Sequence, residues 1–279
     1  MSTIATPMPV ARKAPAFTNL GALATLVRRR FTLTARTPRE LVVPLLTPVL
    51  FALVIAPALR NALHTSAAYE AYVATGTLGL LIPLNTMFAG LGVIGDRVSG
   101  AQPELLAAPI PRALLVVANL VVALGVTALQ VGVLIVAALA RGIDFNASAS
   151  GTLWFAAAAT LFGIGMYGIA ETLAARVPRQ EEYISRVPAI AIVPWFLAGS
   201  LFPIVAMPQG LTYLSKVLPL THGLALMRYG LLGDHSGLEN IWGMSSTGMM
   251  AALSLGVVAI FAAVLTAVSI RVFTRSSVR

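Results

Sequence analysis

Long apolar runs separated by short polar segments dominate the chain. Six of them contain about 20 mainly apolar residues, the length that a helix needs to cross the hydrocarbon core of a bilayer. They cover residues of about 41–59, 71–95, 113–140, 152–175, 187–206 and 248–270. The pattern predicts an all-α polytopic membrane protein with six transmembrane helices.

A different periodicity precedes the first run. Apolar side chains recur there at spacings of three and four residues, the period of one helix face: Phe17, Leu20, Ala24, Val27 and Phe31. Arg28, Arg29 and Arg30 occupy the rest of the surface. We expect an amphipathic helix over residues 17–37 that lies in the membrane interface, with its arginines toward anionic headgroups. It could anchor the topology or dock a partner subunit. Residues 1–16 are expected to form a flexible N-terminus.

Basic residues are distributed unevenly between the two sides of this layout. With the N-terminus inside, fifteen of the nineteen Lys and Arg residues fall in inner segments, and only Arg60, Arg141, Lys216 and Arg228 fall outside. The positive-inside rule therefore predicts that both termini, including the tail 271–279, are cytoplasmic.

The segment of about 207–247 departs from the pattern of a full span. It is apolar enough for a helix, but it carries Lys216, His222 and Arg228 and is interrupted by Pro219 and Gly223. A seventh span would place the C-terminal arginines outside, against the positive-inside rule. We therefore expect a broken pair of shallow re-entrant helices on the outer side, between spans five and six.

Composition narrows the class of protein. The 279 residues are 58% hydrophobic and 10% charged, whereas soluble domains carry about 25% charged residues. A soluble enzyme is excluded, because so few charges cannot cover its surface. With no cysteine there is no disulfide or thiolate metal site. The net charge of +9 is spread along the chain rather than gathered in one patch, so we expect no nucleic-acid partner.

Sequence strings that carry cofactor chemistry elsewhere do not carry it here. Two GxGxxG strings occur, at 90–95 and 163–168, but both lie inside apolar runs, where small residues allow close helix packing. A dinucleotide site would need the string between a strand and a helix. The two lysines, Lys13 and Lys216, do not follow a glycine-rich phosphate loop. We expect neither an enzyme nor a cofactor or metal bound by this chain.

Glu171 is the one acidic residue inside a predicted span. It falls near the cytoplasmic end of span four, where it could pair with an arginine such as Arg176. An ion or proton relay is the other possibility for an intramembrane acid, but such a relay usually needs a partner group near the midplane. An ion-coupled secondary transporter is therefore the alternative, and a membrane enzyme or assembly factor lacks a catalytic constellation. A transporter without its own energy source must obtain it from a partner.

The inner loop 96–112 contains signals for one short exposed helix. Gly100 can end the preceding helix, Pro103 suits the first turn of a new one, and Glu104 is favourable at its positive end. Pro109 and Pro111 then stop it. Such a rigid knob suits insertion into a cleft of another protein, although an ordinary connecting loop would show the same signals.

These residues resemble the cytoplasmic motif of type-2 ABC transporter permeases, the membrane subunits of ATP-binding-cassette exporters. In that family an acid–Arg start, a Gly, an acid–Leu pair, a Pro and an Arg recur in this order. The matching residues are Asp96, Arg97, Gly100, Glu104, Leu105, Pro109 and Arg112. Val98, where the family often has a second acid, and Pro103 depart from the pattern.

A second match lies between spans five and six. Residues 218–222, Arg228 and Gly233 resemble the outer signature of the family, a Pro-Leu-Thr turn followed by an Arg and a Gly. Together with the interfacial helix and the six spans, the resemblance covers essentially the whole chain. The daunorubicin-resistance and nodulation-export branch is the most similar.

The resemblance implies that residues 17–270 form a type-2 ABC transmembrane domain in a bacterial plasma (inner) membrane. Two permeases, identical or homologous, would sit among membrane lipids on two ATPase subunits, which bind ATP and Mg. The pair would export an amphiphile: a lipid, a glycolipid or polysaccharide, or a hydrophobic drug.

The same resemblance assigns roles to particular residues. The loop would be the coupling helix, through the following side chains: Asp96, Arg97, Gly100, Glu104, Leu105, Leu106, Pro109 and Arg112. Polar candidates for the substrate path on spans one, two and five are Thr47, Asn85, Thr86 and Ser200. The outer gate would contain Pro219, His222, Arg228 and Gly233.

Overall fold

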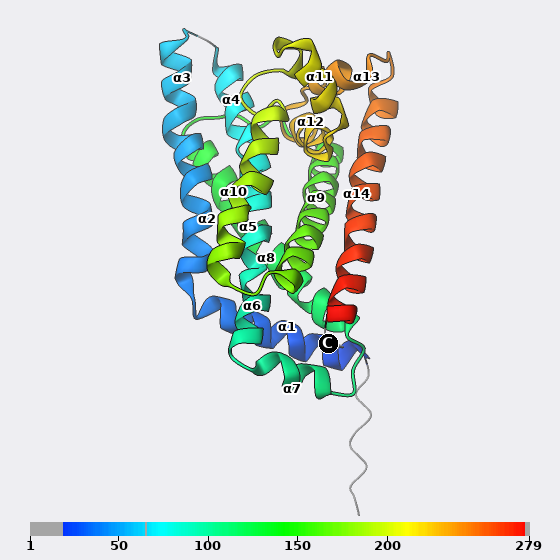
Figure 1. Ribbon diagram of the computed structural model, residues 1–279. Helices are drawn as coiled ribbons and strands as arrows, with labels where there is room; N and C mark the ends of the chain where they lie inside the picture. Colours follow the sequence, from blue (N-terminus) through cyan, green and yellow to red (C-terminus); the bar gives the residue numbers. More distant parts are fainter. Residues whose placement is uncertain (1–18, 65, 277–279) are drawn as a thin grey trace, which may run out of the picture.

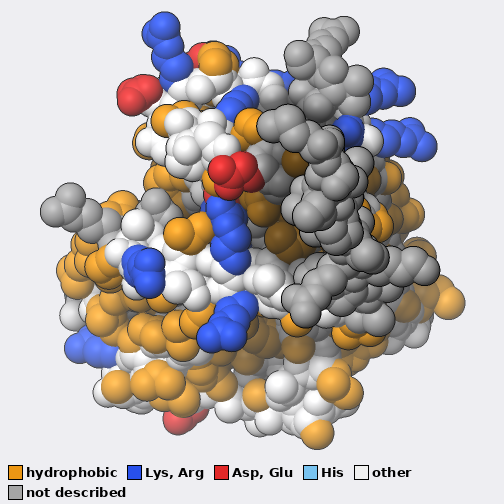
Figure 2. Space-filling view, turned by 90° about the horizontal axis from the view of Figure 1, so that it is seen from below, with side chains coloured by type: hydrophobic (Ala, Val, Ile, Leu, Met, Phe, Trp, Pro, Cys, Tyr) orange, Lys and Arg blue, Asp and Glu red, His pale blue; other side chains and the backbone are white. Residues whose placement is uncertain are grey.

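The computed structural model describes residues 19–64 and 66–276, and this part of the chain is helical, without strands. Most of the helices run along one axis as a bundle, whereas α1 (Asn19–Ala35) and α7 (Ala101–Ala107) cross its lower end (Figure 1). We call this the basic end, because the arginines of α1 gather there. Seen from below, basic side chains are spread over this end among hydrophobic ones (Figure 2).

Five helical stretches are long and apolar enough to cross a membrane: Leu45–Ala62, Ala68–Val98, Ala113–Ala140, Ala149–Arg176 and Thr247–Arg275. They coincide with five of the six predicted runs. The first two are composite, and their parts are α2 (Pro38–Leu50), the π-helical turn η1 (Phe51–Ile55), α3 (Ala56–Ala62), α4 (Ala67–Gly76), α5 (Leu78–Ala89) and α6 (Leu91–Val98). The other three are α8 (Ala113–Ala140), α9 (Ala149–Arg176) and α14 (Thr247–Ser276).

The run predicted at 187–206 has a different shape. Its helix, α10 (Gln180–Leu197), begins seven residues earlier and ends nine residues earlier than predicted. Its first half carries three charged residues, so it is not among the five stretches found by length and composition. The helix stops before Gly199, whose φ of +77° and close contact with Ile204 suit glycine alone. A short 3-10 turn, Ile204–Ala206, follows.

The segment that follows α10 forms three short helices at the end opposite to α1: α11 (Gln209–Val217), α12 (Pro219–Leu232) and α13 (Ser236–Trp242). The predicted break at Pro219 is confirmed, since α12 begins there with proline in its first turn. The break predicted at Gly223 is wrong, because this glycine lies inside α12. The depth of the pair in a membrane stays a prediction.

Helix α9 lies at the centre of the packing, against α14, α12 and α5. Its glycine string makes the approach to α14 possible. A Cβ on Gly168 would lie 2.7 Å from the backbone carbonyl carbon of Leu265, and one on Gly165 would lie 2.3 Å from the Phe261 ring. The packing role predicted for this string is confirmed.

We predict that Gly168→Ala destabilises the protein by about 1–3 kcal/mol, because backbone atoms of α14 must move to admit the methyl group. Gly256→Ala is the matched control, because Gly256 lies on α14 and a Cβ there would have no neighbouring atom within 4 Å. Thermal unfolding of the purified chain in detergent measures both. Equal melting temperatures for the two variants would contradict the packing argument.

Candidate functional site

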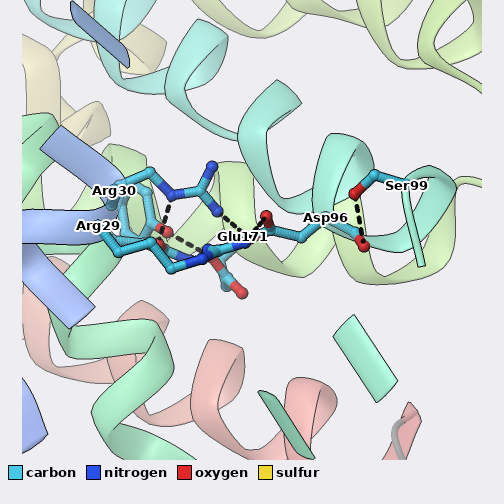
Figure 3. Close-up of polar contacts among 7 residues, drawn as sticks. Arg29, Arg30, Asp96, Ser99 and Glu171 are labelled. Atoms are coloured by element: carbon cyan, nitrogen blue, oxygen red, sulfur yellow. Dashed lines mark hydrogen bonds and ion pairs between the residues drawn. The ribbon is translucent and has the colours of Figure 1, made fainter. Parts of the chain in front are cut away.

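Two arginines of α1 share one carboxylate of α6 at the basic end. Asp96 accepts hydrogen bonds from Arg29, at 2.8 Å from Nη2 and 3.4 Å from Nη1, and from Nη2 of Arg30 (Figure 3). The side chains of Arg30 and Asp96 are 10% and 13% exposed, and that of Arg29 is 33% exposed. The Arg30–Asp96 pair is therefore the less hydrated of the two, and α1 is held to α6 by charge-assisted bonds.

Arg30 also reaches a third helix. Its Nε donates to Oδ1 of Asn119 on α8 at 2.7 Å. The guanidinium lies against Gly92, where a Cβ would come within 2.3 Å of Nη1. The first glycine string thus leaves room for a buried cation, and Arg30 joins α1, α6 and α8.

The expectation that all three arginines point toward headgroups is wrong for Arg30. Helix α1 turns Ala22 and Arg30 inward, whereas Arg28 is exposed. The apolar face of α1 points away from the protein. Leu20 is 81% exposed and Phe31 is 59% exposed, whereas Val27 is half-buried. Phe17 lies outside the described residues. The amphipathic helix itself is confirmed, and it ends at Ala35, two residues before the predicted end at residue 37.

A polar contact links α6 to α9, and a second one lies within α9. Arg97 donates from Nη2 to the backbone carbonyl of Ala174, and the Tyr167 hydroxyl donates to Glu171. Glu171 is fully buried and lies beside the arginine cluster (Figure 3). Among the described residues its hydrogen-bond partner is Tyr167 rather than the predicted Arg176.

The short helix predicted within residues 96–112 is present as α7. Gly100 precedes it with a φ of +78°, a left-handed conformation that breaks the chain away from α6. Asp96 and Arg97 lie on α6 rather than in a loop. Pro103 and Glu104 are exposed.

The leucines of α7 face the bundle. Leu105 and Leu106 are half-buried and pack against the core. Pro109 is exposed, and Arg112 donates to the backbone carbonyl of Thr274 on α14 at 3.2 Å. The exposed residues of α7 are Pro103, Glu104 and Ala107.

At the opposite end, Arg228 of α12 is buried, with 3% exposure. It donates to the carbonyls of Gly199 and Ser200 at 2.9 Å and of Tyr72 at 3.1 Å, and its guanidinium lies 3.4 Å from the centre of the Tyr72 ring. Its hydrogen-bond acceptors among the described residues are neutral. Arg228 thus fastens α12 to α4 and to the turn that ends α10.

His222 belongs to the same helix and is also turned inward. Its Nε2 lies 2.9 Å from the carbonyl of Lys216 and its Nδ1 lies 3.1 Å from the Ser254 hydroxyl, which accepts from Trp242 at 2.8 Å. Burial lowers the pKa of His222, partly offset by the bond to Lys216. Pro219 starts α12, and Gly233, with a φ of +69°, ends it.

The four polar residues predicted for the substrate path are not brought together. Asn85 donates to Thr127 at 2.7 Å, Thr86 to its own helix and Ser200 to the Trp195 carbonyl, and all three are buried. Thr47 is exposed on α2.

The sequence reasoning missed a cavity of about 280 Å³ above α1, between α5–α6 and α8. The cavity is lined by polar side chains, among them Arg29, Arg30, Asp96, Asn119 and Asn85. Asn119 was the available signal, because an amide inside an apolar run needs a partner.

Comparison with known proteins identifies the family. A family model described as "ABC-2 type transporter" matches residues 21–232, which extend from α1 through α7 to the end of α12. No curated protein matches the chain. Within the described residues, no group of three or more His, Cys, Asp and Glu side chains could hold a metal ion.

We predict different coupling energies for the two arginines in double-mutant cycles with Asp96, measured by unfolding in detergent. Arg30 and Asp96, each replaced by Ala singly and together, should show coupling of about 2–3 kcal/mol because both groups are nearly buried. The cycle with Arg29 should give about 1 kcal/mol or less, since this side chain is hydrated. A coupling energy for the Arg29–Asp96 pair that is larger than that for the Arg30–Asp96 pair would contradict the burial of Arg30 described above.

We predict that Arg228→Lys lowers the stability by about 2–4 kcal/mol, although it keeps the charge. An ammonium group cannot reproduce the planar fork that reaches three carbonyls and stacks on Tyr72. Arg141→Lys is the control, because Arg141 is exposed. The unfolding midpoints of both variants are compared with that of the wild type. An unchanged midpoint for Arg228→Lys would refute the stabilising role of these Arg228 contacts.

Proposed function

Because the chain belongs to the ABC-2 type transporter family, we propose that it is the permease subunit of an exporter that moves an amphiphilic substrate outward. ATP and Mg would be bound by a separate ATPase subunit, two copies per complex, beneath a pair of identical or homologous permeases. The daunorubicin-resistance and nodulation-export branch remains the proposed relationship.

The position of α7 carries this proposal. The helix is short, is partly exposed at the basic end, and is separated from α6 by two residues, Ser99 and the left-handed Gly100. The last turns of α6 hold Asp96 and Arg97, which bind α1 and α9 respectively. A displacement of α7 by a partner therefore acts on two further helices through polar contacts, without needing a flexible linker.

The proposed orientation follows the charge distribution. The basic end would face the bacterial cytoplasm with both termini, and α10 would complete six spans. The pair α11–α12 would form the outer re-entrant gate. Helices α2 and α10 leave large apolar side chains exposed, among them Leu46, Leu50, Val193 and Phe196, as α8 and α14 also do. This exposed apolar surface supports contact with lipid or with a second permease.

One observation favours the alternative, an ion-coupled secondary transporter. Glu171 is fully buried, and its Oε1 has no hydrogen-bond partner among the described residues. Transport by that mechanism would follow an ion gradient and would be lost in Glu171→Gln, whereas ATP-driven export would require the partner subunit.

We predict that Glu104→Lys weakens association with the ATPase subunit by about tenfold or more, because reversing an exposed interfacial charge places like charges together. The measurement is a pull-down of the tagged chain from mild detergent, followed by an ATPase assay of the retained material. Glu239→Lys is the matched control, an exposed glutamate on α13 at the opposite end.

The variant should keep the melting temperature of the parent chain, because the Glu104 carboxylate has no hydrogen-bond or ion-pair partner among the described residues. Wild-type protein that purifies without any ATPase would refute the proposed function. Full retention of the ATPase by Glu104→Lys would refute the role of α7.

A further inference from the structure

The cavity above α1 has a polar floor and apolar walls. Its floor is formed by Arg29, Arg30 and Asn119, together with the carboxylate of Asp96. Its walls are lined by apolar side chains of α1, α5, α6 and α8: Leu33, Phe88, Leu91, Val122 and Val126. At about 280 Å³ it is close to the lower end of ligand pockets in proteins, about 300–1,000 Å³.

The cavity is elongated along the bundle. It reaches from the level of Asn119 to that of Val126 on α8, seven residues, or about 10 Å of helix rise. Several lining residues at the basic end are exposed, among them Thr37, Ser99 and Gln180. The polar floor and the accessible rim are therefore on the same side, at the level where α1 is expected to meet headgroups.

The floor carries a surplus of positive charge. Among the described lining residues the ionisable groups are two guanidiniums and one carboxylate. Glu171 is nearby but is not among them. Nη1 of Arg30 has no acceptor among the described residues, and each guanidinium has five N–H donors. An arginine fork matches the geometry of a phosphate oxygen pair.

We propose that this cavity binds the phosphate-bearing anionic headgroup of an amphiphile, with the start of its chain along Phe88, Val122 and Val126. That the amphiphile is the exported substrate rests on the proposed function. The apolar walls select an amphiphile over a free anion, because a free anion would gain nothing from contact with them.

The test is equilibrium binding to the full chain in neutral detergent, with short-chain phosphatidylglycerol as the anionic probe. Short-chain phosphatidylcholine, which has the same phosphate without net charge, and inorganic phosphate are compared with it. Phosphatidylglycerol should bind about tenfold or more tightly than either and should raise the melting temperature by mass action. Equal affinity for phosphatidylcholine, or equal affinity for inorganic phosphate, would overturn the proposal.

Two variants address the two parts of the cavity. Ala89→Leu adds volume at a lining position without touching the ion pairs, and Arg29→Gln removes the surplus charge while leaving the Arg30–Asp96 pair. Both should weaken phosphatidylglycerol binding about tenfold. The controls are Ala156→Leu, exposed on α9, and Arg141→Gln, exposed at the opposite end, which should bind normally. Wild-type affinity in Ala89→Leu with its fold intact would overturn the site.

The link to export is tested with the co-purified ATPase. Phosphatidylglycerol should stimulate ATP hydrolysis by the complex, and Ala89→Leu should abolish this stimulation without releasing the ATPase. Stimulation that persists in Ala89→Leu would overturn the substrate assignment. Absence of any co-purifying ATPase would instead refute the proposed function, while the binding measurements would still decide whether the site exists.

Discussion

The pairing of two α1 arginines with Asp96 governs the basic end of this protein. A carboxylate or a guanidinium is costly to bury without an oppositely charged partner. Together they allow a helix that crosses the bundle to be fixed beneath the spans. Asn119 on α8 and Gly92 on α6 complete the arrangement, the first as an acceptor and the second by leaving space. Helix α1 is therefore part of the bundle rather than an accessory on its surface.

Another arginine, Arg228, stabilises irregular backbone at the other end of the bundle. The turn that ends α10 exposes backbone carbonyls at Gly199 and Ser200, and Arg228 satisfies both. Irregular backbone is tolerated at membrane depth only where protein groups satisfy it. The two ends thus use the same residue type differently: one pairs it with a carboxylate, and the other uses it as a multiple donor to the main chain.

These two arginine sites also show which parts of the fold can be predicted from the sequence. The apolar runs predicted α8, α9 and α14 closely, and Gly100 and Pro219 marked real helix boundaries, because these signals are local. The end of α10 was missed because the residues after Leu197 are still apolar, and the group that stabilises the turn lies about 30 residues later. The burial of Arg30 was missed because periodicity identifies an apolar face without saying whether lipid or protein covers it. The cavity depends on the relative positions of α1, α5, α6 and α8, which no single segment of the sequence encodes.

The distance along the chain between the partners at the basic end has a consequence for biosynthesis. Arg30 leaves the ribosome 66 residues before Asp96. At about 5–20 residues per second, roughly 3–13 s pass before the carboxylate exists. During that interval neither guanidinium can form its native ion pair. Helix α1 therefore cannot be fixed to the bundle through Asp96 until the segment that forms α6 has been synthesised.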